Sequence, residues 1–245
     1  MDGFDPLQSF GPDVAARYDD ELRGDEDQTV DFLVEAAAGR RVCEFAIGTG
    51  RIAVPLAARG VEVCGIDQSQ ATLDRLHERN ADIPAVRGDM TTDGPDGSFG
   101  LIHLVYNTIG NVLTQEGQVA VFRNAAARLL DDGVFVIETA TPWQTFGRTQ
   151  FVEAECVGSD SVVLDVNRFD PTTQLLSENH VRITADGIRL GPIAQRLTTP
   201  AELDLMAQLA GLHPLGRFGG WEWEPFISES RRHVSVWGRS GSTPW

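Results

Sequence analysis

The sequence predicts an α/β fold in which a doubly wound, mostly parallel sheet of seven strands carries an inserted antiparallel β meander. Up to residue 140, short apolar runs alternate with segments of helical periodicity. Such alternation is typical of a parallel sheet covered by helices on both faces, because each parallel crossover must return along the sheet. After Pro142 the pattern changes to four successive stretches with a period of two, which is typical of an antiparallel meander.

Each predicted strand of the α/β part is a short apolar run bounded by turn residues. These strands are expected at residues 41–47, 61–66, 83–89, 99–107, 134–140, 212–220 and 232–239. Helices with an apolar face are expected at residues 26–38, 51–59, 70–79, 116–130 and 199–211. Ser69 is an expected N-cap, and Thr199 begins a capping box in which Pro200 takes the first helical position.

The chain is expected to divide into three parts. Residues 1–24 are polar and interrupted by helix breakers, so they are expected to form an N-terminal arm or lid. Residues 25–142 and 197–245 form the α/β domain, and residues 143–196 form an inserted antiparallel β subdomain. Because exposed antiparallel edges need pairing or cover, this subdomain is expected either to cover a substrate or to form a homodimer interface.

The charge balance excludes some partners and some chemistry. The chain has 36 acidic and 20 basic residues, which give a formal net charge of −16 at pH 7. This surplus repels phosphate backbones and anionic lipids, and no basic stripe offsets it, so a nucleic-acid partner is not expected. All of the basic residues are Arg, which excludes Schiff-base and lysine-base catalysis.

Nothing in the sequence predicts a membrane segment or a metal site. No apolar stretch approaches the roughly 18 residues that a membrane span needs, and the first ten residues are acidic where a signal peptide would be basic. A cytoplasmic protein without a membrane partner is therefore expected. The three cysteines show no C-x-x-C spacing, and no metal ligands are predicted.

The strongest motif is a strand that ends in a glycine turn and opens a helix, Cys43-Glu-Phe-Ala-Ile-Gly-Thr-Gly-Arg51. Gly48 and Gly50 allow the backbone to approach a ligand closely. Asp67 ends the next strand, where a carboxylate can accept hydrogen bonds from both ribose hydroxyls of a nucleoside. The combination predicts a nucleoside cofactor.

Two kinds of nucleoside cofactor fit this turn. Residues 48–53 satisfy the G-x-G-x-x-A pattern, so an NAD-linked oxidoreductase is one alternative. Glu44 precedes the turn, where its charge would repel a pyrophosphate and attract a cation, and Asp89 adds a carboxylate after the third strand. A site ringed by Glu44, Asp67 and Asp89 favours S-adenosylmethionine (SAM), which carries a sulfonium and an ammonium group.

These motifs, together with the segments PLA, IDQS, RGDM, VYNTIGN and HVSVW, resemble class I SAM-dependent methyltransferases, and in particular the bacterial small-molecule, natural-product group. The resemblance covers residues 40–140 and extends to the rest by general layout. It implies a Rossmann-like methyltransferase fold, and transfer of a methyl group by in-line displacement to an O, N or C atom of a small-molecule acceptor. A SAM-binding protein that does not methylate is the remaining alternative.

The resemblance also implies a set of cofactor-binding residues at the strand ends. The methionine part would contact Glu44, Ala46, Gly48, Gly50 and Arg51, the ribose Asp67, and the adenine Gln68, Asp89 and Met90, while Tyr18 would lie on a lid over the cofactor. Ala46 departs from the family pattern, which usually has its first glycine there.

Residues for the acceptor side are expected after the fourth and fifth strands, because ligands of doubly wound sheets bind outside the carboxyl ends of the strands. The catalytic candidates there are Tyr106, Asn107, Asn111 and Glu138. A dedicated base is optional, because the sulfonium already activates the methyl group and alignment in a dry site supplies much of the rate.

Other polar and aromatic residues are expected either to line a pocket or to have a structural role. Trp143, Trp221 and Trp223 are expected either to line an acceptor pocket or to pack. His103 is expected to be a core histidine, and His180 and Arg168 are expected at the surface of the meander.

Overall fold

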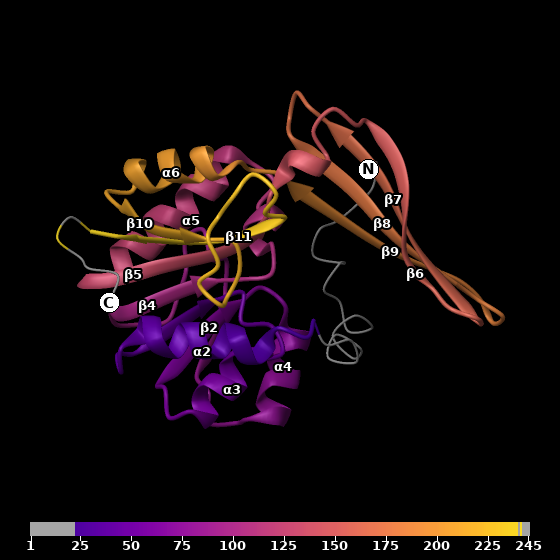
Figure 1. The fold of residues 1–245 in the computed structure, drawn as a ribbon. Helices are drawn as coiled ribbons and strands as arrows, with labels where there is room; N and C mark the ends of the chain where they lie inside the picture. Colours follow the sequence, from indigo (N-terminus) through magenta and orange to yellow (C-terminus); the bar gives the residue numbers. More distant parts are fainter. Residues whose placement is uncertain (1–22, 240, 242–245) are drawn as a thin grey trace.

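The computed structural model describes residues 23–239 and 241, which form two separate sheets (Figure 1). One has seven strands in the order β10-β11-β5-β4-β1-β2-β3, and the other has four strands in the order β6-β7-β8-β9. The four-stranded sheet extends away from the α/β body (Figure 1). Tyr18 and most of the predicted N-terminal arm, residues 1–22, lie outside the described residues.

The seven-stranded sheet has the predicted, mostly parallel topology. Its strands are β1 (Val42–Phe45), β2 (Val63–Asp67), β3 (Ala85–Arg87), β4 (Phe99–Leu104), β5 (Leu129–Ala140), β10 (His213–Phe218) and β11 (Arg232–Gly238). Strands β1 to β5 pair in parallel, whereas β11 is antiparallel to both β5 and β10. The expected doubly wound sheet is confirmed.

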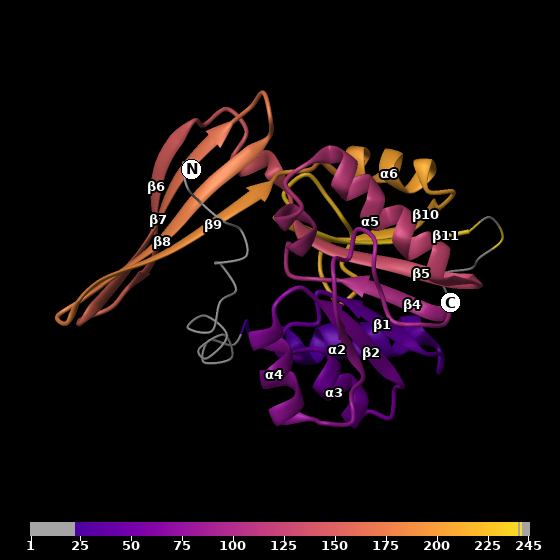
Figure 2. The ribbon, with the colours of Figure 1, turned by 180° about the vertical axis from the view of Figure 1, so that it is seen from behind.

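Helices cover both faces of this sheet, which lies between α5 and α6 on one side and α2, α3 and α4 on the other (Figure 2). The helices are α2 (Glu26–Ala37), α3 (Ala53–Ala58), α4 (Gln70–Arg79), α5 (Gln115–Arg128) and α6 (Pro200–Leu209), with short 3-10 helices η2 (Thr108–Asn111) and η3 (Pro142–Gln144). Coverage on both faces explains why the central strands are continuous apolar runs. Among the helices of residues 23–239, none combines the length and apolar character that crossing a bilayer requires.

Local signals place the starts of α4 and α6 close to prediction, but several element ends differ, and β5 begins at Leu129 rather than at 134. The Ser69 and Thr199 side chains accept hydrogen bonds from backbone N–H groups three residues later, at 3.4 and 3.2 Å. The helix predicted at residues 116–130 ends at Arg128, because Leu129 already pairs with β4. The strand predicted to reach residue 107 ends at Leu104, because positions 106 and 107 have φ angles of +67° and +59° that leave the β region.

The inserted meander is confirmed as four antiparallel strands. They are β6 (Gln150–Val157), β7 (Ser161–Asp170), β8 (Leu175–Thr184) and β9 (Gly187–Arg196). Because side chains alternate along a strand, the register divides the sheet into two unlike faces. The polar face carries Glu153, Glu155, Asp165, Asn167, Glu178 and His180. The apolar face carries Val152, Val157, Val166, Ile183, Ile188 and Leu190, all solvent-exposed.

Candidate functional site

A pocket lies at the carboxyl ends of β1 and β4, the edge at which ligands bind in doubly wound sheets. Its walls come from the segment that leads into α2, the turn between β1 and α3, and the residues after β4. The lining residues are Arg23, Asp25, Glu26, Thr29, Glu44, Ala46, Ile47, Gly48, Thr49, Arg51, Ile52, Val105, Tyr106 and Thr108. The structure thus brings four of the sequence-predicted site residues of the β1–α3 region, Glu44, Ala46, Gly48 and Arg51, together with Tyr106, whereas Gly50 is not among the residues that line the pocket.

The two glycines of the β1–α3 turn serve different purposes. At Gly48, with φ +56°, an added Cβ would meet only the Ala46 carbonyl at 3.9 Å, so the space above this backbone is open to a ligand. At Gly50, with φ +78°, an added Cβ would lie 2.4 Å from Leu76 Cδ1, so this glycine allows α4 to pack on the turn. Ala46 also has a positive φ, +55°, a conformation that favours glycine and that explains the family preference at this position.

Asp67 is fixed at the end of β2 by three hydrogen bonds. Its Oδ2 accepts from the Gly48 N–H at 2.9 Å, and its Oδ1 accepts from the Ser69 N–H at 2.8 Å and the Thr72 hydroxyl at 3.2 Å. Burial raises the pKa of Asp67, and these hydrogen bonds oppose the rise. Two carboxylate oxygens offer about four acceptor sites and these hydrogen bonds use three, so about one stays free for a ribose hydroxyl next to the glycine turn.

Glu44 is a buried carboxylate that lines the pocket. Its side chain is 4% exposed, and its Oε2 has no hydrogen-bond partner among the described residues. Burial, reinforced by the charge of Asp67, raises the pKa of Glu44 well above its usual range. An unpaired carboxylate is costly to bury, so a cation bound in the pocket would stabilise its ionised form.

Two guanidinium groups flank Tyr106 on the opposite wall. The Arg23 guanidinium carbon lies 3.6 Å from the centroid of the Tyr106 ring, and that of Arg51 lies 5.2 Å from it. Arg51 Nη1 also lies 3.9 Å from a Glu26 carboxylate oxygen. The pocket therefore offers both carboxylates and guanidinium groups, a combination suited to the ammonium and carboxylate of an amino acid, such as the methionine end of SAM.

Glu138 anchors an ion-pair network at the end of β5. Its side chain is 1% exposed and accepts from the Tyr106 N–H at 2.7 Å and from the Arg23 guanidinium at 3.3 and 3.4 Å. Arg232 of β11 lies 4.0 Å from the same carboxylate and pairs with Asp25 as well. This geometry makes Glu138 a positioning residue for Tyr106 and for the segment before α2.

Sequence reasoning missed Arg23, Asp25 and Arg232. The partners Arg23 and Glu138 are 115 positions apart, and Asp25 and Arg232 are 207 positions apart. No local pattern marks such pairs, because periodicity and capping report only on near neighbours in the chain. The one available signal was the buried position of Glu138, since a buried carboxylate requires a partner.

The remaining acceptor-side candidates lie around the β4–η2 turn. The Asn107 Oδ1 accepts hydrogen bonds from the Thr139 hydroxyl at 3.2 Å and from the Ala140 N–H, which ties the end of β4 to β5. Asn111 is half-buried at the end of η2 and is not among the residues that line the pocket. Both remain predictions as catalytic residues.

The adenine candidates lie on the other side of Asp67. The Gly88 N–H donates to the Asp67 carbonyl at 3.0 Å, which places Asp89 beside the end of β2. Met90 is 9% exposed and belongs to the core, while Gln68 is exposed immediately after β2. The chain therefore gathers Asp67, Gln68 and Asp89 at neighbouring strand ends, and their contacts with adenine remain a prediction.

Two of the three loop tryptophans pack against a helix. Trp221 is 3% exposed, and the rings of Trp221 and Trp223 lie 5.3 and 4.2 Å from that of Phe32 in α2. Trp143 is 45% exposed and borders a hollow whose other lining residues belong to the loop that precedes β11 in the chain. His103 is fully buried beside Glu44, and burial lowers its pKa to about 3, so it is a neutral core residue.

Comparisons with known proteins identify related methyltransferases. Residues 42–133 match the family model described as a methyltransferase domain. The chain is similar to the cypemycin N-terminal methyltransferase of a Streptomyces species, at 28% identity over 81% of this chain and 82% of the relative.

Solved methyltransferase structures share the fold. The CcbJ methyltransferase from Streptomyces caelestis is 32% identical, with a TM-score of 0.90 over 96% of this chain and 99% of that chain. SAM-bound CalS10, an amino pentose methyltransferase from Micromonospora echinaspora, is 20% identical, with a TM-score of 0.69 over 93% of this chain and 95% of that chain.

Family and geometry lead to one cofactor. SAM is the cofactor of this protein, and the buried Glu44, the open Gly48 and the anchored Asp67 fit its cationic and ribose parts. The oxidoreductase alternative receives no support. The chain is an enzyme that belongs to the class I SAM-dependent methyltransferases.

Proposed function

We propose that the protein methylates an amine nitrogen of a small-molecule or peptide acceptor by in-line displacement. The polar face of the inserted sheet carries this proposal, because three carboxylates gather there around a single histidine. Such a face attracts a protonated amine. The relative named as a cypemycin N-terminal methyltransferase supports nitrogen as the methylated atom.

The ion pairs of His180 show how charge is distributed on this face. Its Nδ1 lies 2.6 Å from an Asp165 oxygen and 3.3 Å from a Glu155 oxygen, and its Nε2 lies 3.9 Å from a Glu178 oxygen. Burial by itself would lower the pKa of His180, but Glu178 and Asp165 raise it above its usual value. Arg148 pairs with Glu153 at 2.7 Å, but one imidazolium does not neutralise the three carboxylates around His180, and Arg182 and Arg189 lie nearer the hairpin tips.

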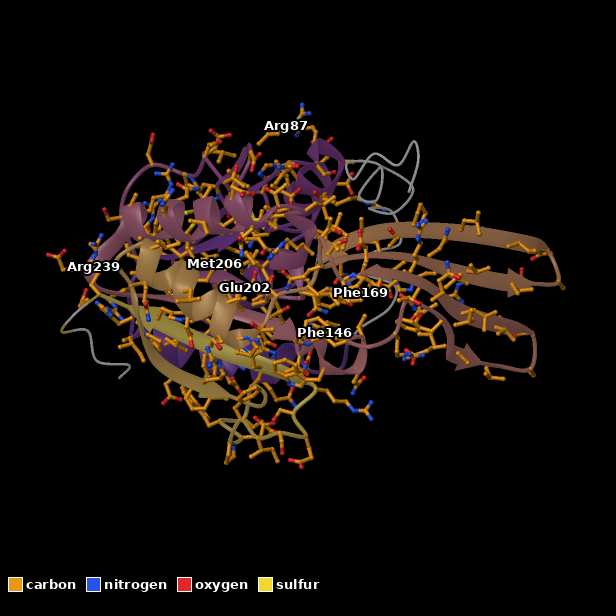
Figure 3. The ribbon with its side chains drawn as sticks, turned by 90° about the horizontal axis from the view of Figure 1, so that it is seen from above. Arg87, Phe146, Phe169, Glu202, Met206 and Arg239 are labelled. Atoms are coloured by element: carbon orange, nitrogen blue, oxygen red, sulfur yellow. The ribbon has the colours of Figure 1, made fainter. Side chains whose placement is uncertain are left out.

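The polar face begins near the donor pocket. Phe169, at the base of that face, stacks on Phe146 with the ring centroids 5.7 Å apart, and Phe146 follows shortly after β5 (Figure 3). Glu138 of the same strand holds Tyr106 in the pocket wall. The base of the polar face therefore lies near the edge of the sheet at which SAM binds, and Asp165 and His180 lie four residues further along the strands.

The chain supplies orientation and exclusion of water. When bound, SAM provides a methyl group that its sulfonium already activates for displacement. Glu44 and Asp67 would hold the donor, and the Arg23–Tyr106 stack would form the wall that excludes water. An acceptor that arrives as an ammonium must first lose a proton, and carboxylates such as Asp165 and Glu178 would accept it.

A donor titration and an acceptor panel test the proposal. Calorimetry with SAM, S-adenosylhomocysteine (SAH) and NAD should show binding of the first two only. Purified enzyme with SAM would then be incubated with amines, phenols and carboxylic acids, and SAH formation and product mass would be measured. Methylated amines are the expected products. Methylation of phenols without methylation of any amine would overturn nitrogen as the target.

The apolar face of the inserted sheet supports a second proposal, that two protomers pair through it. Isoleucine, leucine and valine side chains of that face are 38 to 75% exposed. A contiguous apolar patch of this kind on a sheet is typical of an interface. In this arrangement residues 143–196 form a distinct subdomain beside the SAM-binding domain of residues 25–142 and 197–245, with its polar face toward the acceptor.

A further inference from the structure

Asn107 follows β4 at the rim of the donor pocket. Its neighbours in the chain, Tyr106 and Thr108, both line that pocket, and consecutive Cα atoms lie only about 3.8 Å apart. Asn107 therefore lies where the donor pocket meets the carboxyl ends of β4 and β5, the edge at which ligands of doubly wound sheets bind.

The end of β5 holds the turn after β4 in a strained backbone conformation. Tyr106 and Asn107 have φ angles of +67° and +59°, which residues other than glycine rarely adopt. The Glu138 carboxylate accepts from the Tyr106 N–H at 2.7 Å, and the Glu138 carbonyl accepts from the Asn107 N–H at 3.3 Å. Strain that neighbouring groups maintain in this way is typical of functional sites.

The same strand end determines the orientation of the Asn107 carboxamide. A backbone N–H can only donate, so the carboxamide atom that meets the Ala140 N–H is the oxygen. That oxygen also accepts from the Thr139 hydroxyl at 3.2 Å. Both bonds use Oδ1, so the two N–H donors of Nδ2 point away from the strand end.

Other polar groups of this turn already have partners. The Thr108 hydroxyl donates to the Val105 carbonyl at 2.7 Å, and the Asn107 carbonyl accepts from the Gly110 N–H at 2.8 Å. By contrast, no residue in the described part of the chain accepts a hydrogen bond from Asn107 Nδ2. The side chain is half-buried, and none of the buried polar atoms that lack a partner belongs to it, so its NH2 group is open to solvent. The turn thus presents hydrogen-bond donors beside the donor pocket.

We infer that Asn107 selects an acceptor with a carbonyl oxygen next to the amine that is methylated, and that Nδ2 donates to this oxygen. An NH2 group that only donates cannot hold an ammonium, whose N–H groups also donate. A neutral carbonyl suits the site better than a carboxylate, because the net charge of −16 disfavours an anion. The acceptor class is an α-amino amide, of which a peptide N-terminus is a member. This inference rests on the proposed N-methylation.

Three probes on the SAH-loaded enzyme test this role by calorimetry. Alaninamide carries an amine with a neighbouring carbonyl, isopropylamine carries the amine alone, and propionamide carries the carbonyl alone. Alaninamide should bind most tightly, about tenfold more tightly than isopropylamine. Asn107→Asp keeps an oxygen for the Ala140 N–H and replaces the NH2 group by a second oxygen. This variant should remove the advantage of alaninamide and leave SAH affinity unchanged.

Asn80→Asp is the matched control. Asn80 is also half-buried, its Oδ1 accepts from the Asp82 N–H at 3.0 Å, and it follows α4 outside the pocket lining. The control adds the same charge and should change the affinity of no probe. If Asn107→Asp does not fold, Asn107→Gly removes the NH2 group, allows the left-handed φ and should give the same loss.

The contrary outcomes separate the two proposals. Equal affinities of alaninamide and isopropylamine, or no binding of either, overturn the role of Asn107. A preference for alaninamide that persists in the Asn107 variants overturns it as well. Propionamide that binds as tightly as alaninamide, and only when Asn107 is present, keeps the carbonyl contact and overturns the amine as the target.

Discussion

The seven-stranded sheet and the inserted four-stranded sheet differ in how far they bury their side chains. Every residue of β4 is buried, because helices cover both faces of the parallel sheet. In β6, by contrast, residues 152–157 are all exposed. Within residues 23–239, no α-helix covers either face of the inserted sheet (Figure 1), so its order rests on strand pairing and on whatever covers its apolar face. The seven-stranded sheet therefore stabilises the fold, whereas the inserted sheet presents its faces for contact with other molecules.

Carboxylates are concentrated in both regions, but their negative charge is balanced to different degrees. In the donor pocket, burial raises the pKa of Glu44 and Asp67, and Glu44 Oε2 has no partner in the described part of the chain. In the inserted sheet, burial raises the pKa of Glu178, but the charge of His180 opposes the rise. A bound cation is thus needed most in the pocket, whereas the polar face is already partly neutralised.

The largest expected effect contrasts one glycine in each region. Gly50→Ala should lower the free energy of unfolding by about 3 kcal/mol, because it combines a left-handed φ with a Cβ placed 2.4 Å from Leu76. Gly187→Ala, in the β8–β9 turn, has positive φ but open space and should cost about 1 kcal/mol. Urea unfolding measures both, and equal losses would break the proposed contrast between the two regions.

Asp67→Asn should weaken SAM and SAH binding about 100-fold, because an amide loses the charge-assisted hydrogen bond that a carboxylate accepts from a ribose hydroxyl. It should also cost about 1–3 kcal/mol of stability, because the amide oxygen can accept from the Gly48 N–H or the Ser69 N–H, but its NH2 group cannot accept from the other. Calorimetric titration measures the affinity, and Asp27→Asn on the exposed side of α2 is the control. An unchanged affinity in a folded variant would remove Asp67 from the cofactor site.

Glu44→Gln should stabilise the ligand-free enzyme while weakening SAM binding. The pKa of Glu44 is higher in the folded state than its usual 4.5, so the folded protein binds this proton more tightly and its stability falls as pH rises above about 4.5. The variant lacks that loss, and its melting temperature at pH 7 should exceed that of the unaltered enzyme by about 2–5 °C, with no difference near pH 4.

Proton release provides a second measurement at Glu44. Binding of a cationic cofactor should ionise Glu44, and the released protons can be counted by calorimetry in buffers of different ionisation enthalpy. Glu44→Gln should reduce the count. The same proton count in both proteins would show that Glu44 does not respond to the cofactor.

The smallest expected effect on the protomer is that of Leu190→Glu, on the apolar face. Leu190 is 64% exposed, so the substitution should leave SAM affinity and protomer stability nearly unchanged. In the proposed dimer it should shift the mass in light scattering from twice the chain mass to 26.7 kDa. Thr184→Glu, at the hairpin end, is a control for added charge. An unaltered enzyme that is already monomeric would contradict the dimer.

Much of the fold follows from local sequence signals. The alternation of apolar runs and helical periodicity predicts the parallel sheet, because helices must cover both of its faces. The period-two stretches at residues 150–196 predict the meander almost strand by strand. The motif around Gly48 and the acid at Asp67 predict the cofactor, since each is recognised from the short segment of chain at the end of its own strand.

Other features depend on contacts that only the folded chain makes. Arg23 and Arg232 approach Glu138 from distant segments, and these ion pairs could not be predicted from the sequence, while a catalytic role for Glu138 stays a prediction. Trp143 and Trp221 were both candidates for an acceptor pocket, with Trp143 favoured, and in the folded chain packing against Phe32 buries Trp221 whereas Trp143 borders a hollow. Sequence periodicity determines which face of an element is apolar, whereas tertiary packing determines which apolar and charged groups meet, because that depends on the positions of segments far apart in the chain.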